Sequence, residues 1–264
     1  MTSERIGSLD SFSTREKYLL YLRHLFAYEF TKGMIQSTDM VLDVGCGLGY
    51  GASILGKAAV HVLGLDTNAT VVTEATQEYG RSDVLFRQYD GINIPTQDSY
   101  YDIVVAFHLL EHIKDDAVFV GELYRVLRPG GFLLLTTPNR VYRLKPGQRP
   151  WNQFHVREYD AQGLKDTLGK VFHPDNIGML GICGTPEVQE MEHRRVAWAL
   201  RDGPLSAIRR AIPDSVKVAI SVVLGLLCRR RSLDFLVRHG VDDFHTVAEN
   251  VTDGLDLMAM CRKP

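Results

Sequence analysis

A glycine-rich turn preceded by an acidic residue is the segment of this sequence best suited to hold a small ligand. Residues 41–51 read VLDVGCGLGYG, so an apolar run ends in Gly45, Gly47 and Gly49. Glycine permits positive φ angles and lets a ligand approach the main chain closely. The G-x-G-x-G spacing differs from the G-x-G-x-x-G that seats a pyrophosphate. Asp43 would repel a phosphate, so the turn favours a cationic, amine-bearing ligand.

Two further acids follow the next two apolar runs. Asp66 comes 21 residues after Gly45, where a carboxylate can accept hydrogen bonds from both hydroxyls of a ribose. Asp90 follows the third run, where it can accept a hydrogen bond from an adenine amino group. Three acids without a phosphate clamp favour S-adenosylmethionine over a nicotinamide dinucleotide as the bound molecule.

Four side chains later in the sequence could take a proton from an alcohol acceptor. They are His108, Glu111, His112 and His155. A general base must lie within hydrogen-bond reach of the hydroxyl that it deprotonates. The segment from His108 to His112 also spells H-x-x-E-H, the inverted signature of some zinc proteases. We reject that interpretation, because the signature needs a long helix and here it follows an expected buried strand.

Short apolar runs alternate with helical patterns, and this alternation predicts how the candidate residues are positioned. The expected strands are residues 40–44, 61–65, 84–88, 103–107, 132–136, 177–183 and 255–261. The expected helices are residues 14–30, 51–57, 69–79, 116–127 and 161–168. Repeated strand–helix–strand units imply a parallel sheet with helices on both faces. We therefore expect an α/β, Rossmann-like fold with a seven-stranded, mostly parallel sheet and a helical insertion before the last strand.

The same patterns divide the chain into four parts. We expect an N-terminal helical cap at 1–38, the ligand-binding core at 39–184, a basic helical insertion at 185–245 and the last strand of the core at 246–264. The insertion is interpreted as an addition to the sheet and not as a second independent core.

An apolar helical stretch flanked by arginines lies within this insertion, at residues 209–231. Ten basic and three acidic residues fall between Arg194 and Arg238, although the net charge of the whole chain is −2. Such a stretch can form a lid over the pocket, a homodimer contact, or a helix lying in a membrane interface. We expect no nucleic-acid partner, because no pattern of stacking aromatic residues accompanies the basic charge.

The composition indicates an ordinary globular protein. Hydrophobic residues are 45% and charged residues 23% of the 264 positions, which excludes disordered, collagen-like and coiled-coil chains. The four cysteines are scattered without a metal-binding spacing, as expected of a reduced, cytoplasmic protein. No apolar run reaches the roughly 18 residues of a membrane span, and the polar residues 1–17 do not fit a secretory signal.

From about residue 41 to residue 139, several motifs in a fixed order resemble those of class I S-adenosylmethionine-dependent methyltransferases. After the glycine turn they are GLD at 64–66, YDG at 89–91, YDIVV at 101–105, LEH at 110–112 and LRPGG at 127–131. The resemblance implies an enzyme that transfers a methyl group from S-adenosylmethionine to an acceptor.

The resemblance also implies roles for individual residues around this cofactor. The methionine part would be held by Asp43, Gly45, Gly47 and Gly49, the ribose by Asp66 beside Thr67, and the adenine by Asp90 and Gly91. Phe107 and His108 would line the pocket near the sulfonium. Tyr28 would either close over the cofactor or serve as a packing aromatic residue.

The stretch around Glu111 and His112 resembles that of ubiquinone-pathway O-methyltransferases, in which acids and a histidine hold a divalent ion. The resemblance implies a metal site at Glu111 and His112 for an ion such as Mg²⁺. His108 stands where that pattern has an acid, which weakens the magnesium interpretation. A structural cap between strand and helix is the alternative role for these two residues.

The loop at 151–159 reads WNQFHVREY and resembles a segment of bacterial methyltransferases associated with glycan assembly. The resemblance implies a saccharide hydroxyl as acceptor, with His155 as a base and with Arg157 and Glu158 orienting the loop. A salt-bridged loop that only caps the following helix is the alternative. An O- or C-methyltransferase of a lipid-soluble ring, such as a quinone or polyketide, is the second enzyme hypothesis. The least favoured hypothesis is a cofactor-binding partner subunit without activity.

Overall fold

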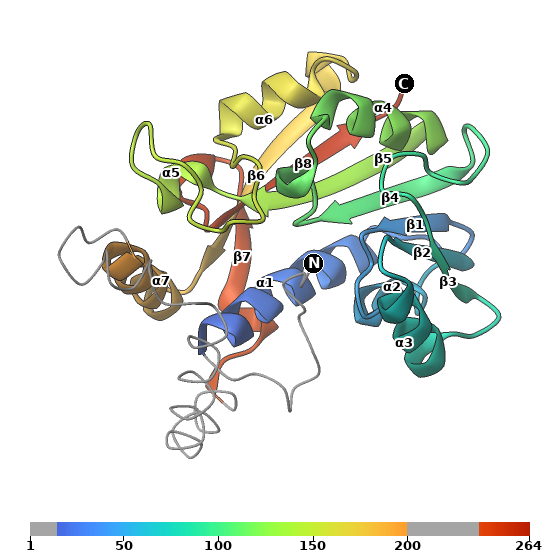
Figure 1. The fold of residues 1–264 in the computed structure, drawn as a ribbon, viewed down its shortest axis with the longest axis horizontal. Coiled ribbons are helices and arrows are strands. Elements are labelled where there is room, and N and C mark those ends of the chain that lie inside the picture. Colours follow the sequence, from blue (N-terminus) through green and yellow to red (C-terminus); the bar gives the residue numbers. More distant parts are fainter. Residues whose placement is uncertain (1–14, 200–237) are drawn as a thin grey trace.

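The computed structural model describes residues 15–199 and 238–264, in which helices cover a twisted sheet (Figure 1). The strands are β1 (Met40–Val44), β2 (His61–Asp66), β3 (Val84–Gln88), β4 (Tyr101–Phe107), β5 (Leu127–Pro138), β6 (Ile177–Gly184), β7 (Phe244–Val247) and β8 (Asp256–Arg262). The helices are α1 (Arg15–Lys32), α2 (Tyr50–Leu55), α3 (Ala69–Tyr79), α4 (Asp116–Val126), α5 (Arg140–Arg143), α6 (Ala161–Leu168) and α7 (Pro186–Ala199). Short 3₁₀ turns are η2 (Leu110–His112), η3 (Pro174–Asn176), η4 (Val241–Asp243) and η5 (Val251–Asp253).

The strands form an eight-stranded sheet in the order β3-β2-β1-β4-β5-β8-β6-β7. Strands β1 to β5 pair in parallel, whereas β8 is antiparallel to both β5 and β6. This confirms the predicted α/β fold with a mostly parallel sheet. Strands β7 and β8 both run antiparallel to β6 and lie on its two sides.

The predicted number of seven strands was wrong, because β7 adds an eighth. Residues 244–247 pair antiparallel with residues 181–184 of β6. The segment has only four residues, and its polar His245 and Thr246 interrupt the apolar pattern that identified the other strands. Residue 245, which the sequence pattern predicts as the end of the basic insertion, lies within β7.

Apolar side chains from the helices bury both faces of the sheet. On one face, Phe119 and Leu123 of α4 pack with Leu164 of α6. On the other face, Leu22 of α1 and Leu55 of α2 belong to a second buried cluster. In Figure 1, α4 and α6 lie on one side of the strands and α1, α2 and α3 lie on the other. Burial on both faces explains why the central strands read as continuous apolar runs.

The strand order reverses between β1 and β4, which are neighbours in the sheet but separated in sequence by β2 and β3. In open α/β sheets, ligands bind outside the carboxyl ends of the strands at such a switch point. The glycine turn follows β1, and the segment containing Glu111 and His112 follows β4. The fold therefore brings both sets of candidate residues to the same edge of the sheet.

Part of the expected basic insertion is described as α7, which follows β6 directly. The apolar stretch at 209–231 lies outside the described residues, so its roles as lid, dimer contact or membrane contact stay predictions. Over the described ranges, we find no helix with both the length and the apolar character that crossing a bilayer requires.

Candidate active site

The glycine turn has the backbone conformation that the sequence predicts. Gly45, Gly47 and Gly49 have φ angles of 80°, 52° and 83°, all in the left-handed region. A Cβ on Gly45 would lie 2.9 Å from the Leu109 side chain, whereas no described atom lies within 4 Å of the corresponding position on Gly47. Gly45 is therefore needed for packing, and Gly47 leaves open space beside the turn that a ligand can occupy.

Asp66, at the end of β2, is joined directly to this turn. One carboxylate oxygen accepts a hydrogen bond from the backbone N–H of Gly47 (3.1 Å), and the other accepts from the N–H of Asn68 (2.9 Å). Each carboxylate oxygen can accept a second hydrogen bond. The Asp66 side chain is only partly buried, so both oxygens retain acceptor capacity toward the open space next to Gly47.

Asp43 lies beneath the turn and is fully buried. Its two carboxylate oxygens share the hydroxyl of Tyr28 at 3.2 Å. Burial raises the pKa of Asp43 to about 7, although the Tyr28 hydrogen bond opposes this shift. The Tyr28 ring packs edge-on against Phe107, with ring centroids 4.9 Å apart, and a Cβ on Gly51 would overlap it. Tyr28 thus supports the turn from below as a packed aromatic residue.

Asp90, after β3, is exposed and folds back on its own loop. Its carboxylate accepts hydrogen bonds from the backbone N–H groups of Ile92 (2.8 Å) and Asn93 (2.7 Å) and from the Asn93 side chain (2.7 Å). The adjacent Gly91 has a φ of 85°, and its Cβ position would lie 3.1 Å from a Thr67 methyl group. The loops after β2 and β3 therefore meet, and the contact of Asp90 with an adenine stays a prediction.

His108 is held from behind by an acid of β8. Its Nε2 lies 3.2 Å from Asp256 Oδ2, and its ring stacks on His24 of α1 at 4.2 Å. Burial alone lowers the pKa of His108, but the charges of Asp256 and Glu111 raise it above its usual value. The raised pKa favours the protonated imidazole, and one of its ring nitrogens is already engaged by Asp256.

Asp256 and Arg23 form the centre of a buried ionic network. Arg23 Nε lies 3.3 Å from Asp256 Oδ2, and Arg23 Nη1 lies 4.0 Å from a carboxylate oxygen of Glu192. Burial raises the pKa of Asp256, but the charges of Arg23 and His108 outweigh this effect and hold it well below its usual value. The network links α1, β8 and α7 directly behind the candidate site.

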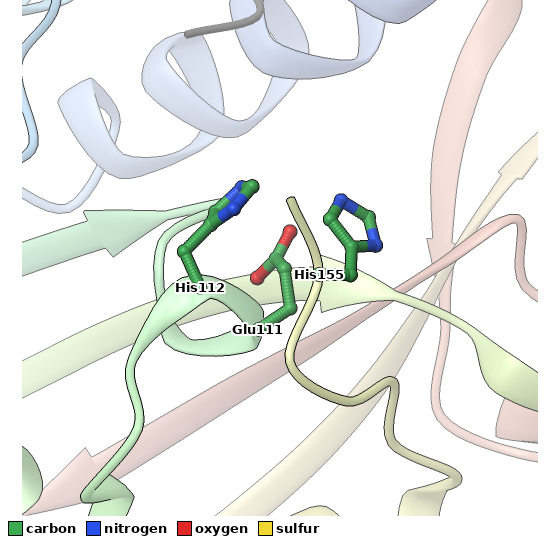
Figure 2. A group of neighbouring side chains, drawn as sticks. All are labelled: Glu111, His112 and His155. Carbon is green, nitrogen blue, oxygen red and sulfur yellow. The ribbon is translucent and has the colours of Figure 1, made fainter. Parts of the chain in front are cut away.

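Glu111, His112 and His155 converge, and Figure 2 shows their side chains turned toward one another. One potential ligand atom from each residue lies within 4.8 Å of the other two. Glu111 and His112 belong to η2, whereas His155 belongs to the loop that precedes α6. The two segments are joined by a hydrogen bond from the Val156 N–H to the Glu111 carbonyl oxygen (2.8 Å).

The comparisons with known proteins agree with this geometry. The family profile described as "Methyltransferase domain" matches residues 42–135. A relative from Mycolicibacterium smegmatis, named "Probable S-adenosylmethionine-dependent methyltransferase", is 33% identical over 262 residues, which cover 94% of this chain and 91% of the relative. The chain belongs to the S-adenosylmethionine-dependent methyltransferases.

Other similar proteins share part of the sequence or the fold alone. A Methylobacterium protein named "Ubiquinone biosynthesis O-methyltransferase" is 30% identical over 159 residues, covering 51% of this chain and 64% of the relative. A solved S-adenosylmethionine-dependent methyltransferase from Thermotoga maritima has a TM-score of 0.57 at 14% identity, and the match covers 94% of each chain. This structural likeness supports the fold and leaves the acceptor open.

The turn of this methyltransferase fits its cofactor. The space next to Gly47 and the acceptor capacity of Asp66 suit a ribose and its hydroxyls. The buried charge of Asp43 beneath the turn suits the cationic methionine part above it. S-adenosylmethionine, when bound, supplies an electrophilic methyl group, and the protein has to orient the acceptor and exclude water.

The raised pKa of Asp43 predicts that cofactor binding depends on pH. Protonation of Asp43 below about pH 7 removes the negative charge beneath the turn, so acid should weaken the binding of the cofactor ammonium. We expect the Kd of S-adenosylmethionine to rise about tenfold between pH 8 and pH 6, as measured by titration calorimetry. Asp43→Asn should bind with a nearly pH-independent Kd. A constant wild-type Kd over this range would contradict the assignment.

The loop at 151–159 uses several of its polar groups to fix its own position. Arg157 contacts Asp116 at 2.7 Å and donates a hydrogen bond to the Lys114 carbonyl oxygen at 2.6 Å. Glu158 is buried, and its Oε1 lies 2.8 Å from His155 Nδ1. The predicted orienting role of Arg157 and Glu158 agrees with these contacts, and so does the alternative of a salt-bridged loop.

Sequence reasoning missed His24, Arg23 and Asp256, which together position His108. One signal was present, because Asp256 is a single acid between leucines in an expected buried strand. Burying a carboxylate without a cationic partner costs free energy, so Asp256 predicts a basic partner elsewhere in the chain. Nothing in the sequence spacing identified Arg23 or His24 as that partner, since both lie on α1, more than 200 residues away.

Proposed function

We propose that this methyltransferase acts on oxygen and that its acceptor is a saccharide hydroxyl. The observation that carries the proposal is the convergence of Glu111, His112 and His155 at the edge of the sheet where the cofactor turn lies. Carboxylate and imidazole groups at one point can bind a hydroxyl and assist the loss of its proton. A neutral amine, by contrast, is nucleophilic enough to accept the methyl group before it loses a proton, so an amine acceptor needs no such group.

The segment that carries His155 also supports a saccharide. Trp151 offers an aromatic ring, and the guanidinium groups of Arg143 and Arg195 lie 5.1 Å and 5.5 Å from its centre. The Asn152 side-chain nitrogen is buried and has no hydrogen-bond partner among the described residues. An aromatic ring and an amide donor are groups that recognise the faces and hydroxyls of a sugar.

A phenolic hydroxyl of a quinol is the second candidate acceptor. Two apolar side chains flank His155 on the surface, Phe154 at 37% and Val156 at 46% exposure. Such residues suit an apolar ring better than a sugar. The partial relative from Methylobacterium is named for ubiquinone biosynthesis, and its match covers half of this chain.

Transfer of labelled methyl from S-adenosylmethionine into a panel of mono- and oligosaccharides, with quinols alongside, tests the proposal. We expect label in a saccharide, with turnover reduced at least tenfold by His155→Ala. His173→Ala is the matched control, because His173 lies on the surface near η3 with its side chain 68% exposed. Label in the quinols alone would contradict the saccharide acceptor and support a phenolic hydroxyl in its place. Label in neither panel, with cofactor binding intact, would contradict both.

A further inference from the structure

We propose that Glu111, His112 and His155 form a binding site for one first-row d-block dication, for which Zn²⁺ is the probe. In this arrangement His155 is a metal ligand and not a general base. The site would hold the acceptor oxygen on the ion. That second part rests on the proposed function, whereas metal binding itself does not.

The first argument is the convergence of one carboxylate and two imidazole groups (Figure 2). Their potential ligand atoms all lie within 4.8 Å of one another. With metal–ligand bonds of about 2.1 Å, the ligand atoms of a tetrahedral ion lie roughly 3.4 Å apart. Small rotations of the side chains close this difference, and the partly buried His112 has room for one.

The second argument is the way in which both imidazoles are held. His112 Nδ1 lies 3.0 Å from the Phe154 carbonyl oxygen, and His155 Nδ1 lies 2.8 Å from Glu158 Oε1. These acceptors place the ring proton on Nδ1 and leave each Nε2 with its lone pair. Metal-binding histidines almost always donate their second ring N–H to a carbonyl or carboxylate in this way. Glu158 is fixed in turn by Arg143, 3.4 Å away.

The third argument is an unsatisfied oxygen on Glu111, a fully buried residue. Oε2 accepts a hydrogen bond from the Thr137 hydroxyl at 3.1 Å. Oε1 has no hydrogen-bond partner within the described ranges, and its ion-pair neighbour His108 is 3.7 Å away. A buried carboxylate oxygen without a donor is costly, and a bound cation removes that cost.

The donor set decides which cation fits. Mg²⁺ prefers oxygen ligands, whereas two imidazoles and one carboxylate suit Zn²⁺, Fe²⁺, Co²⁺ or Mn²⁺. His108 is not part of the converging group, which consists of Glu111, His112 and His155. The magnesium ion named in the sequence analysis is therefore disfavoured, and the ligand set gains His155.

Three protein ligands leave a coordination position open, as in catalytic zinc sites. An acceptor hydroxyl bound there would lose its proton to solvent more easily, because the ion lowers the pKa of a bound oxygen. The oxygen then forms a C–O bond to the methyl carbon as the S–CH₃ bond breaks. The bonding electrons stay on sulfur, and S-adenosylhomocysteine and the methyl ether are the products.

Titration of the metal-free, tag-free chain with Zn²⁺, and separately with Mg²⁺, tests the site without any acceptor. We expect one equivalent of Zn²⁺ to bind, with Mg²⁺ at least 100-fold weaker. His112→Ala and His155→Ala should each weaken Zn²⁺ at least 100-fold, and Glu158→Gln about tenfold. His173→Ala should bind like the wild type. A Co²⁺-loaded sample should show a visible ligand-field spectrum that changes in His155→Ala.

Two results would overturn metal binding: no Zn²⁺ bound at micromolar concentration, or binding that is unchanged by both histidine variants. His112 is partly exposed, so its variant is expected to fold even if substitution of the buried Glu111 or His155 perturbs the chain.

Chelation should abolish methyl transfer, and Zn²⁺, Mn²⁺ or Co²⁺ but not Mg²⁺ should restore it. Transfer that survives chelation would refute the ion's role toward the acceptor. If no acceptor in either panel is methylated, the proposed function fails while the titration still decides the metal site.

Discussion

Replacement of Asp256 by asparagine is expected to lower the free energy of unfolding by about 3–5 kcal/mol. The substitution keeps the shape of the side chain but removes the negative charge between Arg23 and His108. Both cationic partners are buried, so the variant removes from each of them its nearest negative charge in the interior. Chemical denaturation monitored by circular dichroism measures the loss. Asp175→Asn is the matched control, because the Asp175 side chain is 90% exposed, and its effect should stay within about 0.5 kcal/mol.

The pH dependence of this loss follows from the directions of two pKa shifts. The pKa of Asp256 lies below its ordinary 3.8 in the folded chain, so its contribution is present above that pH and is lost in stronger acid. The pKa of His108 lies above its ordinary 6.5 in the folded chain. Its contribution to the free energy of unfolding is therefore present below pH 6.5 and fades as the pH rises through the pKa of the folded state. The difference between wild type and variant should therefore be largest between about pH 4 and pH 6.5. A difference that grows steadily above pH 7 would contradict the ion pair with His108.

The cofactor half of the molecule could be predicted from sequence because each of its signals is local. The apolar runs of β1, β2 and β3 are short and continuous, and each is followed within two residues by a glycine turn or an acid. Parallel pairing then brings those ends to one edge of the sheet without further information. The left-handed φ angles of Gly45, Gly47 and Gly49 confirm the turn that their spacing predicted.

The acceptor half depends on contacts between distant segments, and sequence identified its residues without their arrangement. His155 was expected as a separate base, yet it lies beside Glu111 and His112 because the loop before α6 returns to η2. His108 was expected at the pocket as a base, yet its environment is set by Asp256, 148 residues later. Spacing rules cannot supply such pairs, because any acid on a neighbouring element would fit the same pattern.

The division between the two halves also explains what the comparisons with known proteins decide. The family profile covers Glu111 and His112 but ends at residue 135, before His155 and the loop at 151–159. One fold can carry many different activities, so the substrate has to be argued from the residues of the site. The cofactor follows from family membership, whereas the acceptor has to be argued from Glu111, His112 and the loop at 151–159.

The cofactor site itself is most directly tested at Asp66. Asp66→Ala should raise the Kd of S-adenosylmethionine at least about 30-fold, corresponding to roughly 2 kcal/mol or more. The ribose hydroxyls lose their shared acceptor, and the backbone N–H of Gly47 loses the hydrogen bond that ties the glycine turn to β2. Calorimetric titration with S-adenosylmethionine and with S-adenosylhomocysteine gives the two affinities. Both affinities should fall by a similar factor, because the two ligands share the ribose and differ only in the sulfonium methyl, which does not contact Asp66.

Asp83→Ala is the control for this experiment, because Asp83 is a partly exposed acid directly before β3, far from the carboxyl ends of the strands. Its cofactor Kd should change less than threefold. The cofactor Kd of Asp66→Asn should lie between those of Asp66→Ala and Asp83→Ala. The amide of Asn retains one acceptor oxygen for either the Gly47 N–H or a ribose hydroxyl. An Asp66→Ala chain that folds normally and binds S-adenosylmethionine within threefold of wild type would show that the ribose lies elsewhere. The open space next to Gly47 would then need another occupant.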